Sequence, residues 1–342
     1  ARQAVAILAR EGWVTVSRGR GTLVQDRAAA GRTLHLQTSL ADLADLAAGM
    51  AQLDFGFLYD TSRHLLAIGF NVDEHRRDSG YYDLLASEAR LSVFIGIAQG
   101  ELPQESWFAL GRSLSHSGGE PLLLSWSGSM FEYLMPMLVM PSYANTLLEH
   151  SCRAAVRRQI EHGKQLGLPW GISESGYNAV DAAFNYQYRA FGVPGLGFKR
   201  GLAADQVIAP YASALALMVA PVPACNNLQL LAAGGVLGSR GFYEAIDYTA
   251  SRQRPGSTHT VVRSWMAHHQ GMSLLALAHG LLGEPMQRRF GSDRLFQATV
   301  LLLQERVPRV PAQYASDPAL VDPRTAIDVP GMPVRVFDRA DT

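Results

Sequence analysis

Four short segments of the chain place a carboxylate among aromatic and small residues. They are residues 79–90, 125–133, 169–178 and 241–248. Carbohydrate chemistry needs this combination, because two carboxyl groups can act as acid and as base or nucleophile, while aromatic rings stack on the apolar faces of sugars. The segments therefore suggest a carbohydrate site built from the glutamates that they contain, which are Glu88, Glu132, Glu174 and Glu244.

The same glutamates have a structural interpretation. A buried charge is costly unless it is paired, so a glutamate on an apolar helix is commonly the partner of an arginine or of a backbone N–H group. Arg90, Arg189 and Arg263 are available as such partners. Because a glutamate recurs in such surroundings in four segments, a carbohydrate site is as good an interpretation as structural pairing. Composition alone does not distinguish the two interpretations.

Aromatic residues near these glutamates are candidates for stacking on sugar rings. Loops on a rigid scaffold commonly carry binding residues, which favours Trp126, Trp170 and Tyr177, since they lie near glycine and serine. Core packing is the alternative for every aromatic candidate. The wider set is Tyr186, Tyr188, Tyr243 and Trp265.

Three other motifs are weak. His268 and His269 are adjacent, so they would point about 100° apart on a helix, and no HExxH pair accompanies them. We expect no metal there, and instead a histidine that hydrogen-bonds a sugar hydroxyl. The glycine-rich stretch 195–201 has Arg200 where a phosphate loop has glycine, and residues 171–175 lack the second glycine of GxSxG. We expect neither phosphate binding nor a serine hydrolase.

Composition excludes further classes. The chain has 342 residues with 30 Lys+Arg and 30 Asp+Glu, and this balance gives no sign of a nucleic-acid partner. Hydrophobic residues are 48% of the chain, which is enough for a sizeable core. Every apolar run is shorter than the roughly 18–20 residues of a membrane span. Two cysteines without CxxC spacing indicate no dependence on disulfides.

The helices that must position the candidate residues are predicted from the spacing of apolar residues. Leu40, Leu43, Leu46 and Met50 begin a helical pattern that runs to Leu53. Alternation typical of strands is scarce, and the loops between helices are expected at 113–120, 167–176, 192–201 and 234–241. The other segments expected to be helical are 82–98, 129–140, 146–163, 210–219, 224–233, 264–282 and 292–304.

Three of the glutamates recur at a regular distance. Glu132 follows Glu88 by 44 residues, and Glu174 follows Glu132 by 42. Two antiparallel helices of about 15 residues with two loops of about six give that sum. The spacing predicts stacked helical hairpins, and it leaves an open solenoid and a closed toroid as equal alternatives.

Several long strings of residues carry a family resemblance. They are DFGFLYD (54–60), IGFNVDE (68–74), YYDLLASEARL (81–91), LLSWSGSMFEYLMP (123–136), PWGISESGYN (169–178), NYQYRAFGVPGLGFKRGL (185–202), GFYEAIDY (241–248) and MAHHQGMSLLAL (266–277). In these strings the chain resembles the glycoamylase-like domain in the middle of cyclic β-1,2-glucan synthases. The resemblance extends over residues 54–308, which is most of the chain.

The resemblance implies an all-α fold, an (α/α)6 toroid of helical hairpins with the active-site pocket or cleft at the loop end of the inner helices. Residues 39–310 would then form the catalytic domain, residues 1–38 a connector with a partial helix, and residues 311–342 a linker toward a following domain. We expect the chain to be a segment of a larger protein at the cytoplasmic face of a bacterial inner membrane. Its neighbours there would be a glycosyltransferase region and a phosphorylase-like region.

The family activity is cyclisation of linear β-1,2-glucan by transglycosylation. The resemblance implies Glu174 as nucleophile and Glu88 as acid/base in a retaining mechanism, without cofactor or metal. Glu244 is the main rival for either role, or a ligand of a glucose hydroxyl. The other residues expected to bind substrate are Glu132, Trp126, Trp170, Tyr177, Tyr82, Tyr133, Arg189, Tyr243, His268, His269, Gln270 and Asp60.

Two other functions stay open from the sequence. Endo-β-1,2-glucanases are similar relatives that hydrolyse the same polymer, and they would release shorter linear products. A non-catalytic module would hold the glucan through residues such as Trp126 and Trp170 without turnover. The products formed from linear β-1,2-glucan distinguish these functions from cyclisation.

Overall fold

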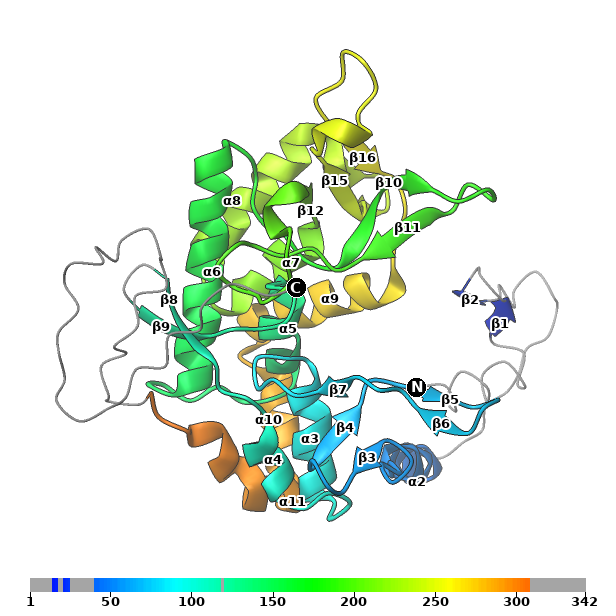
Figure 1. Cartoon of the computed structure of the whole chain (residues 1–342), viewed down its shortest axis with the longest axis vertical. Coiled ribbons are helices and arrows are strands. Elements are labelled where there is room, and N and C mark those ends of the chain that lie inside the picture. The colour runs from blue at the N-terminus through cyan, green and yellow to red at the C-terminus, as the bar shows by residue number, and fades with distance from the viewer. Residues whose placement is uncertain (1–13, 18–20, 25–39, 118–119, 308–342) are drawn as a thin grey trace, which may run out of the picture. The chain divides into compact units, whose positions relative to one another are not determined.

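The computed structural model describes residues 14–17, 21–24, 40–117 and 120–307 (Figure 1). The chain divides into two compact units. Unit 1 comprises residues 1–81 and 93–109, and unit 2 comprises residues 82–92 and 110–342. The expected linker 311–342 and most of the expected connector 1–38 lie outside the described residues. The predicted domain boundaries therefore stay predictions.

Unit 1 is built from short hairpins and short helices. Its helices are α2 (Leu40–Ala51), the C-terminal part of α3 (Ala89–Ala98) and α4 (Glu105–Ala109). Its strands are β1 (Val14–Ser17), β2 (Gly21–Val24), β3 (Tyr59–Asp60), β4 (Leu65–Ala67), β5 (Phe70–Asn71), β6 (Arg76–Arg77) and the start of β7 (Tyr81–Tyr82). Phe55, Phe94 and Trp107 are buried in its core, where the last two rings meet edge to face.

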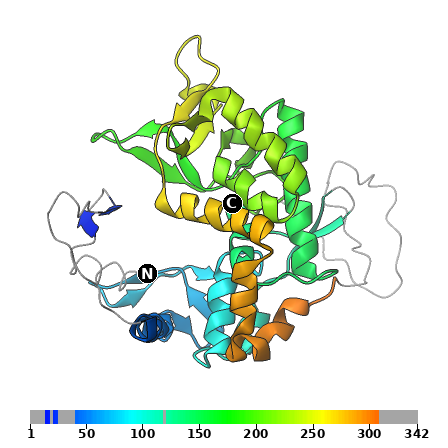
Figure 2. The same ribbon diagram turned by 180° about the vertical axis from the view of Figure 1, so that it is seen from behind.

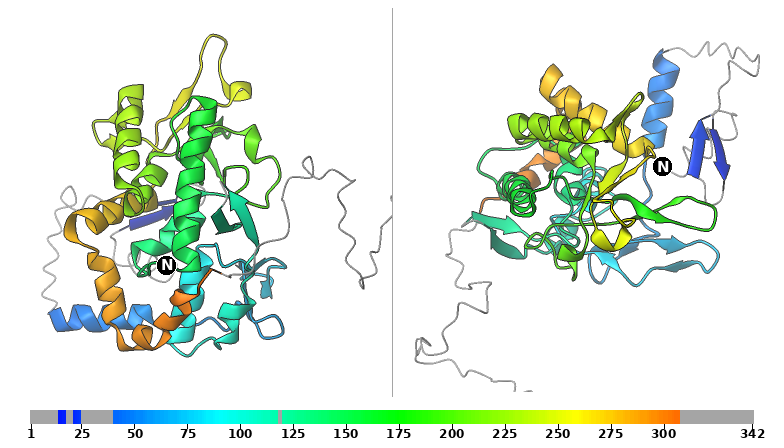
Figure 3. Two further views of the ribbon diagram at one scale, coloured as in Figure 1. Left: turned by 90° about the vertical axis from the view of Figure 1, so that its left-hand side faces the viewer. Right: turned by 90° about the horizontal axis from the view of Figure 1, so that it is seen from above.

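Unit 2 carries the longer helices. The straight helix α6 (Leu147–Leu166) has 20 residues (Figure 3). Thr146 caps its start by accepting from the Glu149 N–H group, and Gly167 ends it in the left-handed conformation that glycine adopts without strain. Another helix, α9 (Ala267–Leu282), ends at Gly283 in the same way and leads into α10 (Pro285–Ser292), drawn in orange (Figure 2).

The remaining helical segments of unit 2 are shorter. They are α5 (Met130–Leu134), η1 (Met135–Leu138), η2 (Leu202–Ala204), α7 (Pro210–Leu215), η3 (Ala216–Met218), α8 (Pro221–Leu231), η4 (Ala232–Val236), η5 (Ala250–Arg252), α11 (Arg294–Thr299) and η6 (Val300–Gln304).

Short strands lie in the connections between the helices of unit 2. The strands β10 (Ser175–Val180) and β11 (Tyr186–Arg189) form a bulged hairpin that extends from the body of unit 2 (Figure 1). A three-stranded antiparallel sheet has the order β12 (Val207–Ile208), β15 (Ala245–Asp247), β16 (Thr260–Val262). Two further hairpins pair β8 (Leu114–Ser117) with β9 (Glu120–Leu123), and β13 (Leu237–Gly238) with β14 (Gly241–Phe242).

The core of unit 2 lies where α5 packs against α6 and α7, and α7 also packs against α8 and α9. Met130, Tyr133, Leu147, Ala155 and Tyr211 are each no more than 3% exposed there. The removal of such apolar side chains from water is the main contribution to the stability of the folded unit. Two loops that carry candidate site residues adjoin this region in the chain, since one leads into α5 and the other follows α6.

The structure differs from the expected all-α class. The described residues contain strands as well as helices, so neither an all-α fold nor a closed (α/α)6 toroid is confirmed. Several strands have only two or three residues, too few for a detectable alternation of apolar and polar residues. Three expected loops contain strand residues: 113–120 contains β8 and the first residue of β9, 167–176 contains the first residues of β10, and 234–241 contains β13 and the first residue of β14.

The helix predictions are confirmed in part. The helices expected over 40–53, 146–163 and 264–282 are present as α2, α6 and α9 with ends shifted by at most three residues. The helix expected over 82–98 begins only at Ala89. The preceding residues are extended, because Tyr82 belongs to β7 and Leu84 pairs with Gly111.

Two glycines let separate backbone segments of unit 2 touch. A Cβ atom at Gly192 would clash with the carbonyl oxygen of Ser127, and one at Gly197 would lie 2.5 Å from the amide nitrogen of Gly128. The chain at 192–197 therefore lies directly against the turn at 127–128, with no room for a side chain.

We expect Gly192→Ala to lower the free energy of unfolding by about 3 kcal/mol, because backbone must move to admit the methyl group. Urea denaturation measures the change. The matched control is Gly291→Ala in α10, where a Cβ meets nothing within 4 Å. An equal effect of both substitutions would contradict the close approach.

Candidate active site

The loop before α5 folds around the carboxylate of Glu132. The hydroxyls of Ser125, Ser127 and Ser129 donate to it, as do the N–H groups of Trp126, Ser127 and Ser129, over 2.5–3.0 Å. Glu132 is 5% exposed. Both of its oxygens are occupied by this loop, so the carboxylate shapes the loop and leaves the indole of Trp126 exposed.

Glu88 lies one residue before α3. The Ser87 hydroxyl donates to its carboxylate over 3.2 Å. The buried guanidinium of Arg90 donates to the carbonyl oxygens of Ser87, Glu132 and Tyr133, and it thereby ties the Glu88 segment to α5. Burial raises the pKa of Glu88, and the charge of Glu132 raises it further, while the Ser87 hydrogen bond and the charge of Arg90 lower it.

Glu174 ends the loop that leads into β10. The side chain of Gln159 on α6 holds this loop by exchanging two hydrogen bonds with the backbone of Ile172. The hydroxyl of Tyr211 on α7 lies 2.9 Å from the carbonyl oxygen of Glu174, to which it donates. Side chains from α6 and α7 therefore fix the backbone that presents this carboxyl group.

The electrostatic surroundings of Glu174 favour its protonated form. Burial is the first cause that raises its pKa to about 7, and the negative charges of Glu88 and Glu132 add to it. The charge of Lys199 and a hydrogen bond with Tyr188 act in the opposite direction.

The structure therefore brings Glu88 and Glu174 within reach of each other's charge. Tyr82 lies beside both, since burial and then the charges of Glu88 and Glu174 raise its pKa. Two carboxyl groups so placed do not readily ionise together. One protonated and one ionised carboxyl group are what retaining cleavage of a glycosidic bond requires.

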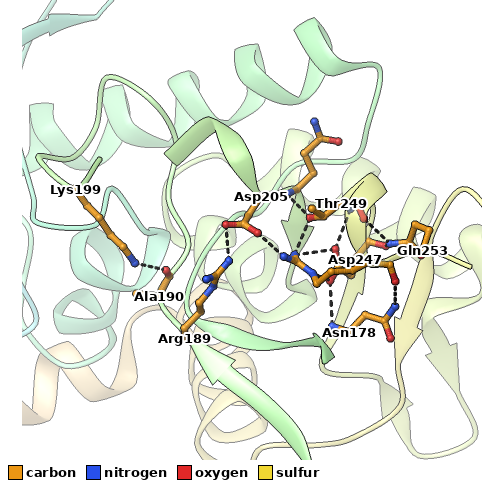
Figure 4. A network of polar contacts seen from close by, with 10 residues as sticks. Asn178, Arg189, Ala190, Lys199, Asp205, Asp247, Thr249 and Gln253 are labelled. Carbon is orange, nitrogen blue, oxygen red and sulfur yellow. Dashed lines mark hydrogen bonds and ion pairs between the residues drawn. The ribbon is translucent and has the colours of Figure 1, made fainter. Parts of the chain in front are cut away.

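Ion pairs fix the hairpin that follows Glu174 (Figure 4). Arg252 donates to Asp205 over 2.5 Å and to Asp247 over 2.7 Å. Arg189 on β11 donates to Asp205, and the N–H group of Asn178 on β10 donates to Asp247. Both strands of the hairpin are therefore tethered to the same pair of aspartates. Arg189, which was expected to bind substrate, takes part in this tether.

The predicted stacking residues occupy different surroundings. Trp126 is 62% exposed and available to a ligand. Trp170 and Tyr133 are buried, and the Tyr133 hydroxyl lies 2.7 Å from two carbonyl oxygens inside unit 2. The half-buried ring of Tyr177 meets the edge of Phe191 and lies under two guanidinium groups. In this structure Trp170, Tyr133 and Tyr177 support the site from within the protein.

Glu244 and His269 form a buried pair, 2% and 1% exposed. Nδ1 of His269 lies 2.9 Å from Oε2 of Glu244, and Oε1 of Glu244 accepts from the Gly176 N–H group. The imidazole stacks on the Tyr211 ring at 3.7 Å, and its Nε2 lies 3.3 Å from the Tyr188 hydroxyl. The pair is therefore connected to the surroundings of Glu174 through Tyr188.

Three more predicted residues lie near this pair in the chain or in space. The exposed His268 approaches the Tyr188 ring, with centroids 6.3 Å apart. Gln270 donates weakly to the carbonyl oxygen of Phe242, and Tyr243 packs against the Trp265 ring. These contacts do not test whether the three residues bind substrate, so that role stays a prediction.

Asp60 belongs to unit 1. Its carboxylate accepts from the backbone and hydroxyl of Ser62, from Arg63 and from the Tyr81 hydroxyl. These bonds, with Ser62 first and Tyr81 second, hold its pKa well below the ordinary value. In this structure Asp60 closes a local turn.

Three residues of the site were absent from the predicted set. Tyr188 appeared in the sequence only as one of several stacking candidates, and Lys199 only as part of the rejected phosphate loop. Tyr211 is one aromatic residue in an apolar helix and carries no signal of its own. Their relevance follows from contacts across segments that are distant in the sequence.

Among residues that the structure describes, no group of three or more His, Cys, Asp or Glu side chains is placed to hold a metal ion. Within the same residues, no helix combines the length and the apolar character needed to cross a membrane.

Comparison with known proteins assigns the family. Residues 80–289, more than half of the chain, match the Glycoamylase family model, described as "Putative glucoamylase". The chain belongs to the glycoamylase family. The matched region of this glycoamylase-family chain includes both Glu88 and Glu174, and it confirms the resemblance seen in the sequence.

A curated relative of this glycoamylase-family chain is the cyclic beta-(1,2)-glucan synthase NdvB of Rhizobium meliloti (strain 1021). The two are 48% identical over 257 residues. The match covers 75% of this chain and 9% of NdvB, so the chain spans a small part of that relative's length.

Two solved structures show the fold of the glycoamylase-family chain. The endo-beta-1,2-glucanase of Chitinophaga pinensis has a TM-score of 0.58 and 15% identity over 78% of this chain and 66% of that one. The endo-beta-1,2-glucanase of Talaromyces funiculosus has a TM-score of 0.51 and 17% identity over 67% of this chain and 47% of that one. At these identities the likeness shows a shared, mainly helical fold.

We expect Arg252→Met to lower the free energy of unfolding by about 3–5 kcal/mol, because it leaves the fully buried Asp247 without its cation. Urea denaturation measures the loss. The control is Arg153→Met, which breaks a pair whose arginine is 67% exposed and is expected to change stability by about 0.5 kcal/mol or less. Similar losses in both variants would contradict the role of the tether.

The raised pKa of Glu174 makes stability depend on pH. The folded protein binds the Glu174 proton up to about pH 7, whereas the ordinary value is 4.5, so the free energy of unfolding falls as pH rises between these values. We expect Glu174→Gln to raise Tm by roughly 2–4 °C at pH 8 and to change it little at pH 4. Calorimetry at both pH values measures the difference. The exposed Glu101→Gln serves as control, and equal shifts in both variants would refute the electrostatic cause.

Proposed function

We propose that this chain is the part of a larger protein that cyclises linear β-1,2-glucan by transglycosylation. The observation that carries the proposal is the coupled carboxyl pair of Glu88 and Glu174, both of which lie in strings that resemble the cyclising domain. The 48% identity to NdvB supports β-1,2-glucan as the substrate.

In the proposed mechanism Glu174 is the nucleophile and Glu88 the acid/base. A carboxylate oxygen of Glu174 bonds to C1 of a glucosyl unit while the bond from C1 to the leaving oxygen breaks, and that oxygen takes the proton of Glu88. The distal 2-hydroxyl of the same glucan chain then attacks C1. Its proton passes to Glu88, the bond between C1 and Glu174 breaks, and a ring with retained configuration is released.

The surroundings of the pair support these roles. Lys199 and Tyr188 favour the ionised form of Glu174, as a nucleophile requires. Ser87 holds the Glu88 carboxyl group beside the start of α3. Trp126 and Tyr82 are the sugar contacts that we propose, because the first is exposed on a rigid loop and the second lies beside both carboxyl groups.

The larger protein is part of the proposal. The matched region is 9% of NdvB, which supports a part of a larger protein. From the family resemblance we propose that this part works between a glycosyltransferase region and a phosphorylase-like region. We place it at the cytoplasmic face of the inner membrane, where nucleotide sugars are available. The helical fold shared with the glucanases supports a complete (α/α)6 toroid for the whole domain.

The test is to incubate the chain with linear β-1,2-glucan and to follow the products by mass spectrometry. We expect species lighter by one water than the linear chains of the same length, since ring closure by transglycosylation consumes no water. Shorter linear chains as the only products would reject cyclisation in favour of hydrolysis. Unchanged substrate would reject both activities in favour of glucan holding.

Two variants test the carboxyl pair. We expect Glu174→Gln and Glu88→Gln each to lower the rate of ring formation at least about 10³-fold, because each removes one half of the chemistry. The exposed Glu101→Gln should keep the wild-type rate. Rings formed at the wild-type rate by both site variants would overturn the assignment.

A further inference from the structure

The buried pair of Glu244 and His269 contacts both strands of the hairpin that follows Glu174. Gly176 on β10 and Tyr188 on β11 are partners across this hairpin. Oε1 of Glu244 accepts from the Gly176 N–H group over 3.0 Å, and Nε2 of His269 lies 3.3 Å from the Tyr188 hydroxyl. The pair therefore fixes one position of the hairpin, which lies two residues after Glu174.

Tyr211 connects the same pair to the backbone of Glu174 itself. Its ring stacks on the His269 imidazole, with centroids 3.7 Å apart and an interplanar angle of 10°. Its hydroxyl donates to the carbonyl oxygen of Glu174 and lies 2.8 Å from the hydroxyl oxygen of Ser173, which accepts from the N–H group of Phe131 on α5. A displacement of the imidazole would therefore move the ring that holds the Glu174 carbonyl group.

The pair is removed from solvent, and its hydrogen-bonding atoms face protein groups. Glu244 is 2% exposed and His269 is 1% exposed. Nδ1 of His269 lies 2.9 Å from Oε2 of Glu244, and because an ionised carboxylate only accepts, the Nδ1 proton is directed to it. The other carboxylate oxygen faces Gly176, and Nε2 faces Tyr188. With so little exposed surface, neither side chain is placed to contact a glucan, although the sequence suggested both as binding residues.

We propose that Glu244 and His269 are positioning residues, which hold the Glu174 carboxyl group in the geometry that attack on C1 requires. Glu174 lies between the two points that the pair fixes, since its own carbonyl group is held through Tyr211 and the backbone after it is held at Gly176. A misplacement of about 1 Å can lower the rate of a reaction about 100-fold. The inference rests on the proposed function, because it takes Glu174 as the nucleophile.

Two substitutions of Glu244 separate positioning from catalysis and from substrate binding. Glu244→Gln keeps an oxygen for the Gly176 N–H group and an amide that can pair with the imidazole, whereas Glu244→Leu removes both. We expect Glu244→Leu to lower kcat for glucan turnover about 100-fold with KM little changed, and Glu244→Gln to retain at least about a tenth of the wild-type kcat.

Three results would overturn the proposal. An equal loss of kcat in both variants would make Glu244 a catalytic carboxyl group, because an amide cannot replace one. A raised KM with an unchanged kcat would make it a ligand of the substrate, bound in the cavity of about 260 Å³ that Glu244 borders. A wild-type kcat in Glu244→Leu would leave the pair without influence on Glu174.

Tyr211→Phe tests the second contact of the pair with the Glu174 segment. This variant keeps the ring that stacks on His269 and removes the hydrogen bond to the Glu174 carbonyl oxygen. We expect kcat to fall about tenfold with KM little changed. A wild-type kcat would overturn the proposal. The variant also replaces Glu244→Leu in every measurement if the latter does not fold.

The matched control is Gln287→Leu in α10. Gln287 is also a buried polar side chain of unit 2, 5% exposed, and its amide donates to the carbonyl oxygen of Met137. We expect this variant to lower Tm and to keep the wild-type kcat and KM. A loss of kcat as large as that of Glu244→Leu would attribute the effect to a general loss of stability and overturn the proposal.

A second measurement needs no turnover and separates this inference from the proposed function. Crystal structures of the wild-type chain and the variants are compared at Glu174, with Glu88 as the internal reference. We expect the Glu174 carboxyl group to move by about 1 Å or more in Glu244→Leu and by less than about 0.5 Å in Glu244→Gln. An unmoved carboxyl group in Glu244→Leu would overturn the positioning role even if glucan rings are formed. A displaced carboxyl group in a chain whose wild type forms no rings would keep the positioning role and reject the function.

Discussion

The buried carboxylate of Glu132 is the constraint on which the rest of the site depends. Six hydrogen bonds from the preceding loop compensate its charge. Those bonds determine the path of the loop, the exposure of Trp126 and the start of α5. The backbone of α5 in turn accepts from Arg90, which holds the segment of Glu88. The negative charge that remains on Glu132 raises the pKa of both Glu88 and Glu174.

The site therefore concentrates negative charge in a partly buried place, at a cost in stability. Unit 2 offsets this cost with rigid support outside the carboxyl pair. Hydrogen bonds from α6 and α7 fix the Glu174 backbone, and the aspartates bound to Arg252 fix the hairpin that carries Tyr188. Such an arrangement is typical of active sites, where groups shifted from their ordinary pKa are held in place by the surrounding structure.

The surroundings of individual residues show what sequence reasoning can and cannot separate. Glu88 and Glu174 were selected from strings that resemble a family, and the structure brings them within reach of each other's charge. Trp170, Tyr133 and Glu132 were selected from the same strings, yet they are buried and engaged within the protein. One short segment can contain both a residue that touches a substrate and a residue that holds the site together. Membership of such a segment therefore does not tell these two roles apart. The short strands were missed because two or three residues show no periodicity.

By itself the sequence determined the family, the absence of a long apolar run, the main helices and the segments that carry the two glutamates. These features depend on residue types and on spacing along the chain, which a sequence displays directly. Only the tertiary structure decided which glutamates are paired, which aromatic rings are exposed, and that His269 lies between Tyr188 and Glu244 within hydrogen-bonding distance of both. Tyr188 and His269, which make one of these contacts, are 81 residues apart in the chain. Burial and hydrogen bonding between such distant segments arise from packing, and packing sets the charge state of each group.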